Sequence, residues 1–157
     1  MIAPQLRLAD WERRTADVDS TRSGEREPSH PRVVLLFTRD RALDDQVAQA
    51  LLGRSAIVLI ARSVGDALQI VCGRGQELDL VVLDVDPQSG GMTLLSAVHT
   101  CHTDLPVLVT AMSSDERVRT LAFANGARAC LNKPLALATL GDAIAELSGP
   151  RVARHIV

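Results

Sequence analysis

The run Leu80-Val-Val-Leu-Asp-Val-Asp86 decides the fold of this chain. Four consecutive apolar side chains, followed by an acidic one, are typical of a short strand that is buried on both faces of its sheet. Strands of this kind belong to parallel sheets, because the crossover connections of a parallel sheet cover both of its faces with helices. Further runs of the same kind are therefore expected on either side of it.

Similar apolar runs occur before it, at residues 33–37 and 56–61, and after it, at residues 107–109 and 129–131. Between the runs, apolar residues recur at the three- and four-residue spacing of helices that bury one face. Five strands that alternate with helices predict an α/β fold. Right-handed crossovers favour a doubly wound, five-stranded parallel sheet, and five units are too few to close an eight-stranded barrel.

The 157 residues suffice for one domain with a sizeable core. Residues 1–31 are more polar and contain Gly and Pro, so we predict a flexible N-terminal extension in which the residues around Trp11 could form one short helix. The domain itself is expected over residues 32–148. Residues 149–157 are expected to form a short C-terminal tail.

Composition excludes several classes of function. The formal net charge of −2 provides no broad basic surface, so direct binding to nucleic acid is not expected. No apolar run approaches the roughly 18 residues of a membrane span, and the N-terminus lacks the apolar core of a signal peptide. We therefore expect a cytoplasmic protein. His99 and His102, with Cys101 between them, have the spacing of a shared metal site, but a solvated helix end is the expected interpretation and no metal is expected there.

In a doubly wound sheet, functional groups gather beyond the carboxyl ends of the strands. Polar and charged residues stand near the ends of four predicted strands: Thr38, Arg39 and Asp40; Asp84 and Asp86; Thr110; and Asn132 and Lys133. A carboxylate, a hydroxyl and an ammonium are thus expected to converge in one shallow crevice. Such a set suits phosphoryl chemistry at a carboxylate.

Three residues of this set have specific expected roles. Asp84 could accept a phosphoryl group, Lys133 could pair with the added charge, and Thr110 could hydrogen-bond a phosphoryl oxygen. Each residue alone has a structural alternative, as a helix cap or a turn residue. Their order at three successive strand ends, and the placement of the only lysine among 17 basic residues, favour the functional interpretation.

These motifs resemble the receiver domain of the response-regulator family of bacterial two-component signalling, over about residues 32–148. The resemblance is carried by three segments: Leu80-Val-Val-Leu-Asp84, Pro106-Val-Leu-Val-Thr-Ala111 and Ala124-Asn-Gly-Ala-Arg-Ala-Cys-Leu-Asn-Lys-Pro134. It implies a flavodoxin-like sheet with strand order 2-1-3-4-5. It also implies that Asp84 is the phosphoacceptor, Thr110 the switch hydroxyl and Lys133 the lysine of the family.

The chain departs from that family pattern at three places, one of which is a loop after Asp84 that is one residue short. The acidic pair that holds a divalent metal is replaced by Thr38 and Arg39, and the switch aromatic is replaced by Cys130. Asp40 and Asp86 are the acidic residues left near Asp84. Asp40 could equally be the N-cap of the following helix. We expect Arg39 to pair with Asp84 and so to replace the metal in part.

The leading hypothesis is an atypical single-domain receiver that acts by protein–protein interaction, with impaired or absent metal-dependent phosphorylation. It is not an enzyme, and it has no catalytic residue, resident metal or cofactor. Its partner is another signalling protein, such as a sensor kinase, an output protein or a regulator, or a second copy of the chain. One alternative is a working phosphorelay receiver that is phosphorylated on Asp84, with Mg²⁺ held by Asp40 or Asp86. A distant alternative is a small phosphatase-like hydrolase, because Asp84-Val-Asp86 resembles the motif of haloacid-dehalogenase-like phosphatases.

Overall fold

The computed structural model describes residues 31–86, 89–112 and 116–148. Nearly all of the predicted N-terminal extension, including the residues around Trp11, lies outside the described residues. The predicted C-terminal tail, residues 149–157, also lies outside them. No helix in the described part of the chain is long and apolar enough to cross a membrane.

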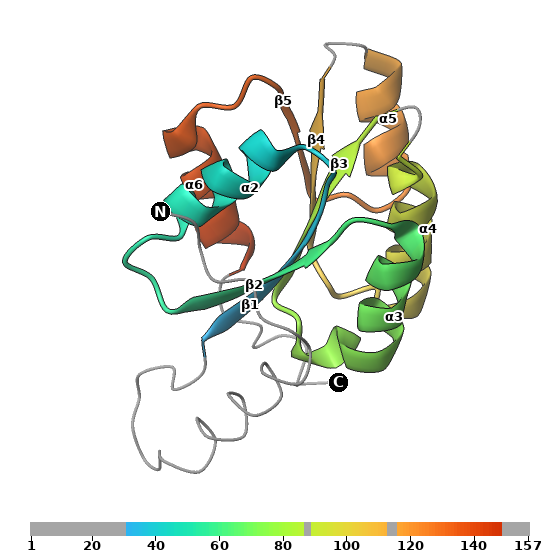
Figure 1. Cartoon of the computed structure of the whole chain (residues 1–157). Coiled ribbons are helices and arrows are strands. Elements are labelled where there is room, and N and C mark those ends of the chain that lie inside the picture. Colours follow the sequence, from blue (N-terminus) through green and yellow to red (C-terminus); the bar gives the residue numbers. More distant parts are fainter. Residues whose placement is uncertain (1–30, 87–88, 113–115, 149–157) are drawn as a thin grey trace.

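The sheet has five parallel strands in the order β2-β1-β3-β4-β5, as Figure 1 shows. Their bounds are β1 Arg32–Phe37, β2 Ala56–Ala61, β3 Leu80–Val85, β4 Val107–Ala111 and β5 Ala129–Asn132. The predicted fold class and strand order are confirmed. Strands β3 and β4 are each two residues longer than predicted, so that Asp84 and Thr110 lie inside strands.

Helices cover both faces of the sheet (Figure 1). Their bounds are α2 Arg41–Ala50, α3 Val64–Arg74, α4 Gly91–Cys101, α5 Glu116–Ala124 and α6 Leu137–Leu147, with a short 3₁₀ helix, η1, at Gly75–Glu77. Helices α2 and α6 lie on one face, and α3, α4 and α5 lie on the other. The alternation of strands and helices along the chain thus produces three layers.

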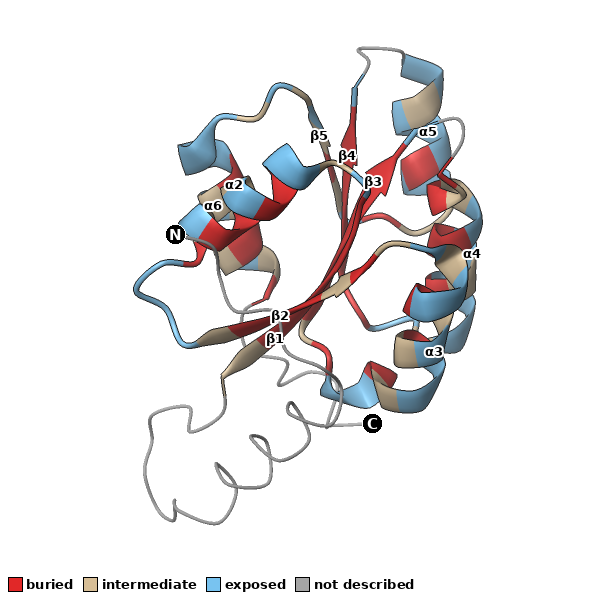
Figure 2. Cartoon of the chain, in the orientation of Figure 1, coloured by how far each residue is buried: buried red, intermediate tan, exposed pale blue. Residues whose placement is uncertain are grey.

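The core consists of two apolar layers, one on each face of the sheet. Along β1, Leu35 and Phe37 pack toward α3 and α4, whereas Val34 and Leu36 pack toward α2 and α6. All six residues of β3 are buried, as the red central strands in Figure 2 illustrate. This double burial explains why the strands are continuous apolar runs rather than alternating ones.

Local sequence signals explain where the helices on either side of the sheet begin. Asp40 is the N-cap of α2, and Ser63 is the N-cap of α3, where its hydroxyl accepts a hydrogen bond from the backbone of Asp66. Gly90 precedes α4 with a φ of 77°, in the left-handed region that favours glycine. These starts place the first turns of α2, α3 and α4 next to the carboxyl ends of the strands.

Candidate functional site

Four polar side chains meet at the carboxyl edge of the sheet. The register of the sheet places Asp84 in β3 directly beside Thr110 in β4. Thr38 follows the end of β1, and Lys133 follows the end of β5. Parallel strands that end at one edge therefore bring together residues that are far apart in sequence, as predicted for Asp84, Thr110 and Lys133.

Three donors of the chain itself occupy the carboxylate of Asp84, which is only 6% exposed. The hydroxyl of Thr38 donates to Oδ2 over 2.6 Å, and the hydroxyl of Thr110 donates to Oδ1 over 3.1 Å. The ammonium of Lys133 lies 3.0 Å from each of the two oxygens. A buried carboxylate needs such partners, because an unpaired buried ion destabilises the fold by an amount on the order of several kcal/mol.

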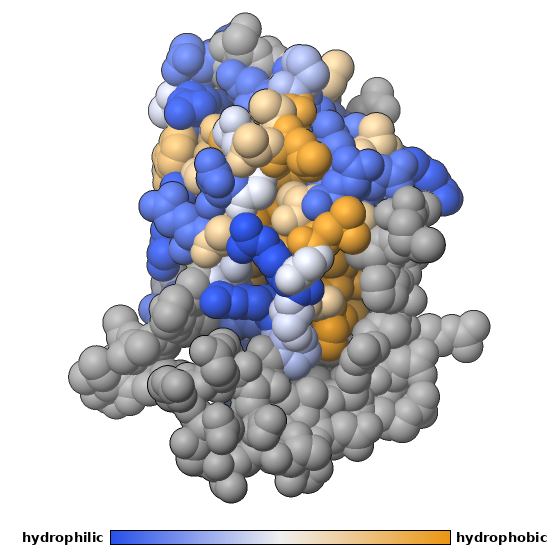
Figure 3. Space-filling view, turned by 90° about the vertical axis from the view of Figure 1, so that its left-hand side faces the viewer, coloured by the Kyte–Doolittle hydropathy of each residue, from blue (hydrophilic) through white to orange (hydrophobic). Residues whose placement is uncertain are grey.

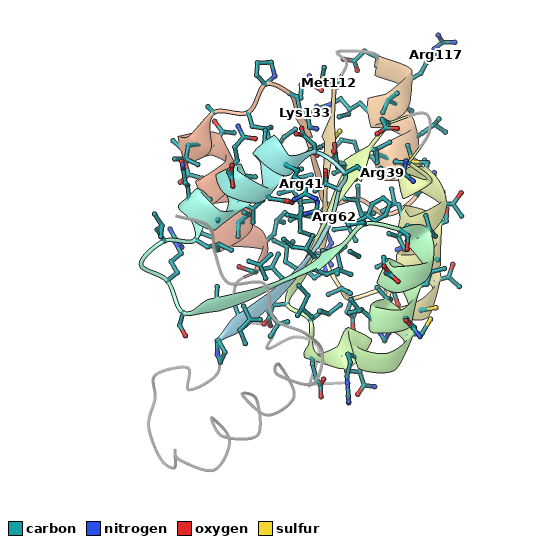
Figure 4. All side chains as sticks on the ribbon, in the orientation of Figure 1. Arg39, Arg41, Arg62, Met112, Arg117 and Lys133 are labelled. Atoms are coloured by element: carbon teal, nitrogen blue, oxygen red, sulfur yellow. The ribbon has the colours of Figure 1, made fainter. Side chains whose placement is uncertain are left out.

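Lys133 joins two carboxylates rather than one. Its Nζ donates to Oδ2 of Asp40 over 2.9 Å as well as to Asp84, and its side chain is 11% exposed. Burial by itself lowers the pKa of Lys133, but the hydrogen bonds and negative charges of Asp40 and Asp84 outweigh burial and raise the pKa above its ordinary value. Lys133 is therefore protonated at neutral pH. Its side chain is labelled in Figure 4.

Asp40 is the N-cap of α2, which is one of the two roles that the sequence left open, and it also binds Lys133. Its Oδ1 accepts the backbone N–H of Ala42 over 2.9 Å, as an N-cap does, and its Oδ2 accepts Lys133. Its own backbone N–H donates to the hydroxyl of Thr38 over 2.9 Å. The hydrogen bond from Lys133 outweighs burial and holds the pKa of Asp40 below its ordinary value.

We expect the contribution of Asp40 to stability to disappear in acid. A depressed carboxyl pKa stabilises the fold above the unfolded-state value of about 3.8, and the stabilisation is lost as the pH falls through the folded-state pKa. Asp40→Asn keeps an N-cap acceptor but removes the charge. In urea unfolding, the variant should be less stable than wild type at pH 6, and the difference should shrink toward pH 3. A difference that stays constant over this range would contradict the assignment.

The predicted pairing of Arg39 with Asp84 is wrong. Arg39 is exposed, and in the described part of the chain no hydrogen bond or ion pair joins it to Asp84. Thr38 is buried and its hydroxyl points into the site, whereas the neighbouring Arg39 is exposed. The hydroxyl of Thr38 therefore holds the contact with Asp84 that we expected of Arg39.

Arg62, which directly follows β2, is an interacting residue that the sequence analysis missed. Its guanidinium contacts both carboxylate oxygens of Asp44 in α2 and donates to the backbone carbonyl of Thr38 over 3.0 Å. The signal that could have revealed it is Asp44, a carboxylate next to Leu43 on the apolar side of a helix. A charge in that position needs a partner of opposite sign.

The described residues do not fit a divalent metal in the way that the family pattern requires. The ammonium of Lys133 already bridges Asp40 and Asp84. Asp86 is exposed, and its backbone N–H donates to the hydroxyl of Ser89 over 3.2 Å. In the part of the chain that the structure describes, no group of three or more His, Cys, Asp or Glu side chains is placed to share a metal ion.

His99 and His102 take up separate structural positions. Nε2 of His102 lies 3.0 Å from the carbonyl oxygen of Val71, and its ring fills the space beside Gly75. The ring of His99 instead packs against Gly126, where a Cβ atom would lie 2.5 Å from Nδ1. The two rings thus pack against different elements, and their spacing is explained by packing.

Cys130, which was expected at the position of the family's switch aromatic, is a buried thiol. Cys130 is 5% exposed, and burial raises the pKa of its thiol above the ordinary value. The guanidinium of Arg119 donates to the carbonyl of Cys130 over 3.2 Å and lies 5.5 Å above the ring of Phe123. A small neutral side chain therefore takes the inner position, and Arg119 and Phe123 lie outside it.

The response regulator receiver domain family matches residues 34–145. No curated protein matches the chain. Among solved structures, the receiver domain of an HD domain-containing protein from Pseudomonas fluorescens Pf-5 is 22% identical, with a TM-score of 0.75, and the match covers 86% of this chain and 100% of that one. A CheY-like receiver domain protein from Methanospirillum hungatei JF-1 is 21% identical, with a TM-score of 0.69 and coverage of 79% and 98%. A response regulator from Thermotoga maritima is 21% identical, with a TM-score of 0.67 and coverage of 75% and 98%. These structural likenesses show the same fold.

Proposed function

The chain belongs to the response regulator receiver family of signal transduction proteins, and we propose that it contains an atypical receiver domain in which metal-dependent phosphorylation is impaired or absent. One observation carries the proposal. Both oxygens of the Asp84 carboxylate are occupied by Thr38, Thr110 and Lys133, and Lys133 also binds Asp40. The position between the two carboxylates is therefore filled by a cation of the chain itself.

The proposal follows from what phosphorylation would require of this site. Mg²⁺ in proteins is usually held by one or two carboxylates together with water and phosphate oxygens. To admit the ion, Lys133 would have to leave both Asp40 and Asp84, and Thr38 offers a hydroxyl where the family has a carboxylate. The nucleophilic oxygen of Asp84 would also have to lose a charge-assisted hydrogen bond, which is about twice as strong as a neutral one.

In this proposal the domain acts as an interaction module and not as an enzyme, and it holds no resident cofactor. The distant phosphatase hypothesis needs the second acid of its Asp84-Val-Asp86 motif to act beside Asp84. Asp86 is exposed, and its backbone is held in a turn with Ser89 instead. The working phosphorelay receiver stays the second candidate, because Asp84, Thr110 and Lys133 are in contact; only this alternative requires Mg²⁺.

The proposed partner is another signalling protein of the bacterial cytoplasm, such as a sensor kinase, an output protein or a regulator, with a second copy of the chain as the alternative. Exposed apolar side chains are available for such a contact: Met112, Leu121, Phe123 and Leu137. Leu121 and Phe123 lie on α5, next to Arg119. Figure 3 shows further apolar side chains in the middle of the face that carries α2 and α6.

Intact mass spectrometry after incubation with acetyl phosphate and Mg²⁺ tests the proposal. We expect the wild-type mass to stay unchanged, because Lys133 and Thr38 compete with both the ion and the phosphoryl group for Asp84. The Asp84→Asn variant is the matched control. A wild-type gain of one phosphoryl group that is absent from the control would overturn the proposal and establish the working phosphorelay receiver.

A further inference from the structure

Arg62 makes contacts that tie together three elements near the site. Its Nη1 and Nη2 atoms lie 3.2 and 2.5 Å from the two carboxylate oxygens of Asp44 in α2. Its Nη1 also donates to the carbonyl of Thr38, just after β1. Figure 4 shows Arg62 in the middle of the molecule, between α2 and the strands. Because Asp44 is buried and the side chain of Arg62 is only 33% exposed, the pair is shielded from much of the solvent.

We propose that Arg62 is a positioning residue that couples helix α2 to the Asp84 carboxylate through Thr38. Arg62 does not touch Asp84; it fixes the backbone of the residue whose hydroxyl does. This coupling is independent of the proposed function, because it would exist whether or not Asp84 accepts a phosphoryl group.

The geometry of the pair limits how Arg62 can move. A guanidinium that binds a carboxylate through two nitrogens has a fixed plane and direction, unlike a single-point contact. The same guanidinium reaches the carbonyl of Thr38, so α2 and the end of β1 share one anchor. A shift of α2 therefore moves Asp44, Arg62 and the backbone of Thr38 together.

Thr38 transmits that position to the site because its carbonyl and its hydroxyl are both bound, while its backbone N–H donates to the carbonyl of Ala61 over 3.3 Å. Its carbonyl accepts Arg62, and its hydroxyl donates to Asp84 while accepting the backbone N–H of Asp40. Lys133 in turn binds Asp40 and Asp84. Loosening the carbonyl of Thr38 should therefore weaken the hydroxyl contact and change the surroundings of Lys133.

The coupling gives the exposed side of α2 a route to the site. Arg41 and Asp45 are exposed on the helix that carries Asp44. A protein partner that binds there and displaces α2 would alter the hydrogen bonds of Asp84 without any change in phosphorylation. This consequence, unlike the coupling, rests on the proposed function.

The single lysine of the chain provides a direct probe of this coupling. Selective ¹⁵N,¹³C-lysine labelling yields one side-chain signal, that of Lys133, whose ammonium hydrogen-exchange rate reports the strength of its contacts. The informative variant is Arg62→Met with Asp44→Asn, which removes both charges and so leaves no buried charge unpaired. We expect the hydrogen-exchange rate of the Lys133 ammonium to rise by at least about twofold. A change of this size corresponds to the lower end of the coupling measured between residues of one hydrogen-bond network.

Two controls separate positioning from a general loss of structure. Arg41→Met removes an exposed arginine of α2, the helix that carries Asp44. This change should leave the Lys133 exchange rate unchanged. In a Thr38→Val background, the Arg62 and Asp44 changes should have no further effect, because the transmitting hydroxyl is absent. Backbone amide spectra establish that each variant is folded. An unchanged Lys133 exchange rate in the folded double variant, or an equal effect with and without the Thr38 hydroxyl, would overturn the proposal. Failure of the proposed function would appear instead as a phosphoryl mass gain in wild type.

Discussion

Lys133→Met is expected to destabilise the fold by about 3 kcal/mol, the lower end of the cost of removing one partner of a buried ion pair. Methionine keeps the apolar stem but removes the ammonium. Asp84, which is 6% exposed, would then keep only the hydroxyls of Thr38 and Thr110. Asp40 contributes less to the cost because its side chain is 40% exposed and water can replace the lost contact. Urea unfolding at neutral pH measures the effect.

The double variant Lys133→Met with Asp84→Asn is the matched comparison. Removing both charges leaves no buried ion unpaired, so most of the lost stability should return. Asp84→Asn alone should cost less than Lys133→Met, since Lys133 keeps its bond with Asp40. A loss below about 1 kcal/mol for Lys133→Met, the range of exposed pairs, would mean that water reaches Asp84 and that the site is open to ions.

The layered fold could be predicted from the sequence because its strands are buried on both faces. Continuous apolar runs such as residues 80–83, separated by segments with helical spacing, are typical of the strands of a covered parallel sheet. The ends of the strands could not be predicted as well. Asp84 and Thr110 continue the backbone pairing of β3 and β4 although their side chains are polar. One polar residue interrupts each apolar run, but the hydrogen-bonded ladder continues through it to Val85 in β3 and Ala111 in β4.

The partners of the site were harder to predict than its members. The convergence of Asp84, Thr110 and Lys133 could be predicted, because each stands at the carboxyl end of a strand and parallel strands end at the same edge of the sheet. Whether Thr38 or Arg39 faces Asp84 depends on the direction of one side chain after β1, and a sequence pattern does not determine that direction. Arg62 lies 18 residues from its partner Asp44, and only the fold brings them together.

Restoring an acidic pair, by Thr38→Asp with Arg39→Asp, is expected to create a divalent-metal site. The first change replaces a hydroxyl donor by a carboxylate beside Asp84, and the second removes a cation from the neighbouring position. Without metal, the added like charges should lower stability at neutral pH. With Mg²⁺ at a hundred times its dissociation constant, binding should stabilise the variant by about 2.7 kcal/mol. Urea unfolding with and without MgCl₂ measures this gain and does not depend on any reaction.

The outcome of this variant discriminates between two physical causes of the loss of phosphorylation that we propose for Asp84. If the missing acidic pair is the cause, the variant should gain one phosphoryl group from acetyl phosphate and Mg²⁺, whereas the same pair in an Asp84→Asn background should gain none. If the variant binds Mg²⁺ but gains no phosphoryl group, the contacts of Lys133 with Asp40 and Asp84 are themselves inhibitory. If Mg²⁺ does not stabilise the variant, the prediction of a metal site is wrong. In that case carboxylates at residues 38 and 39 are not sufficient to bind the ion.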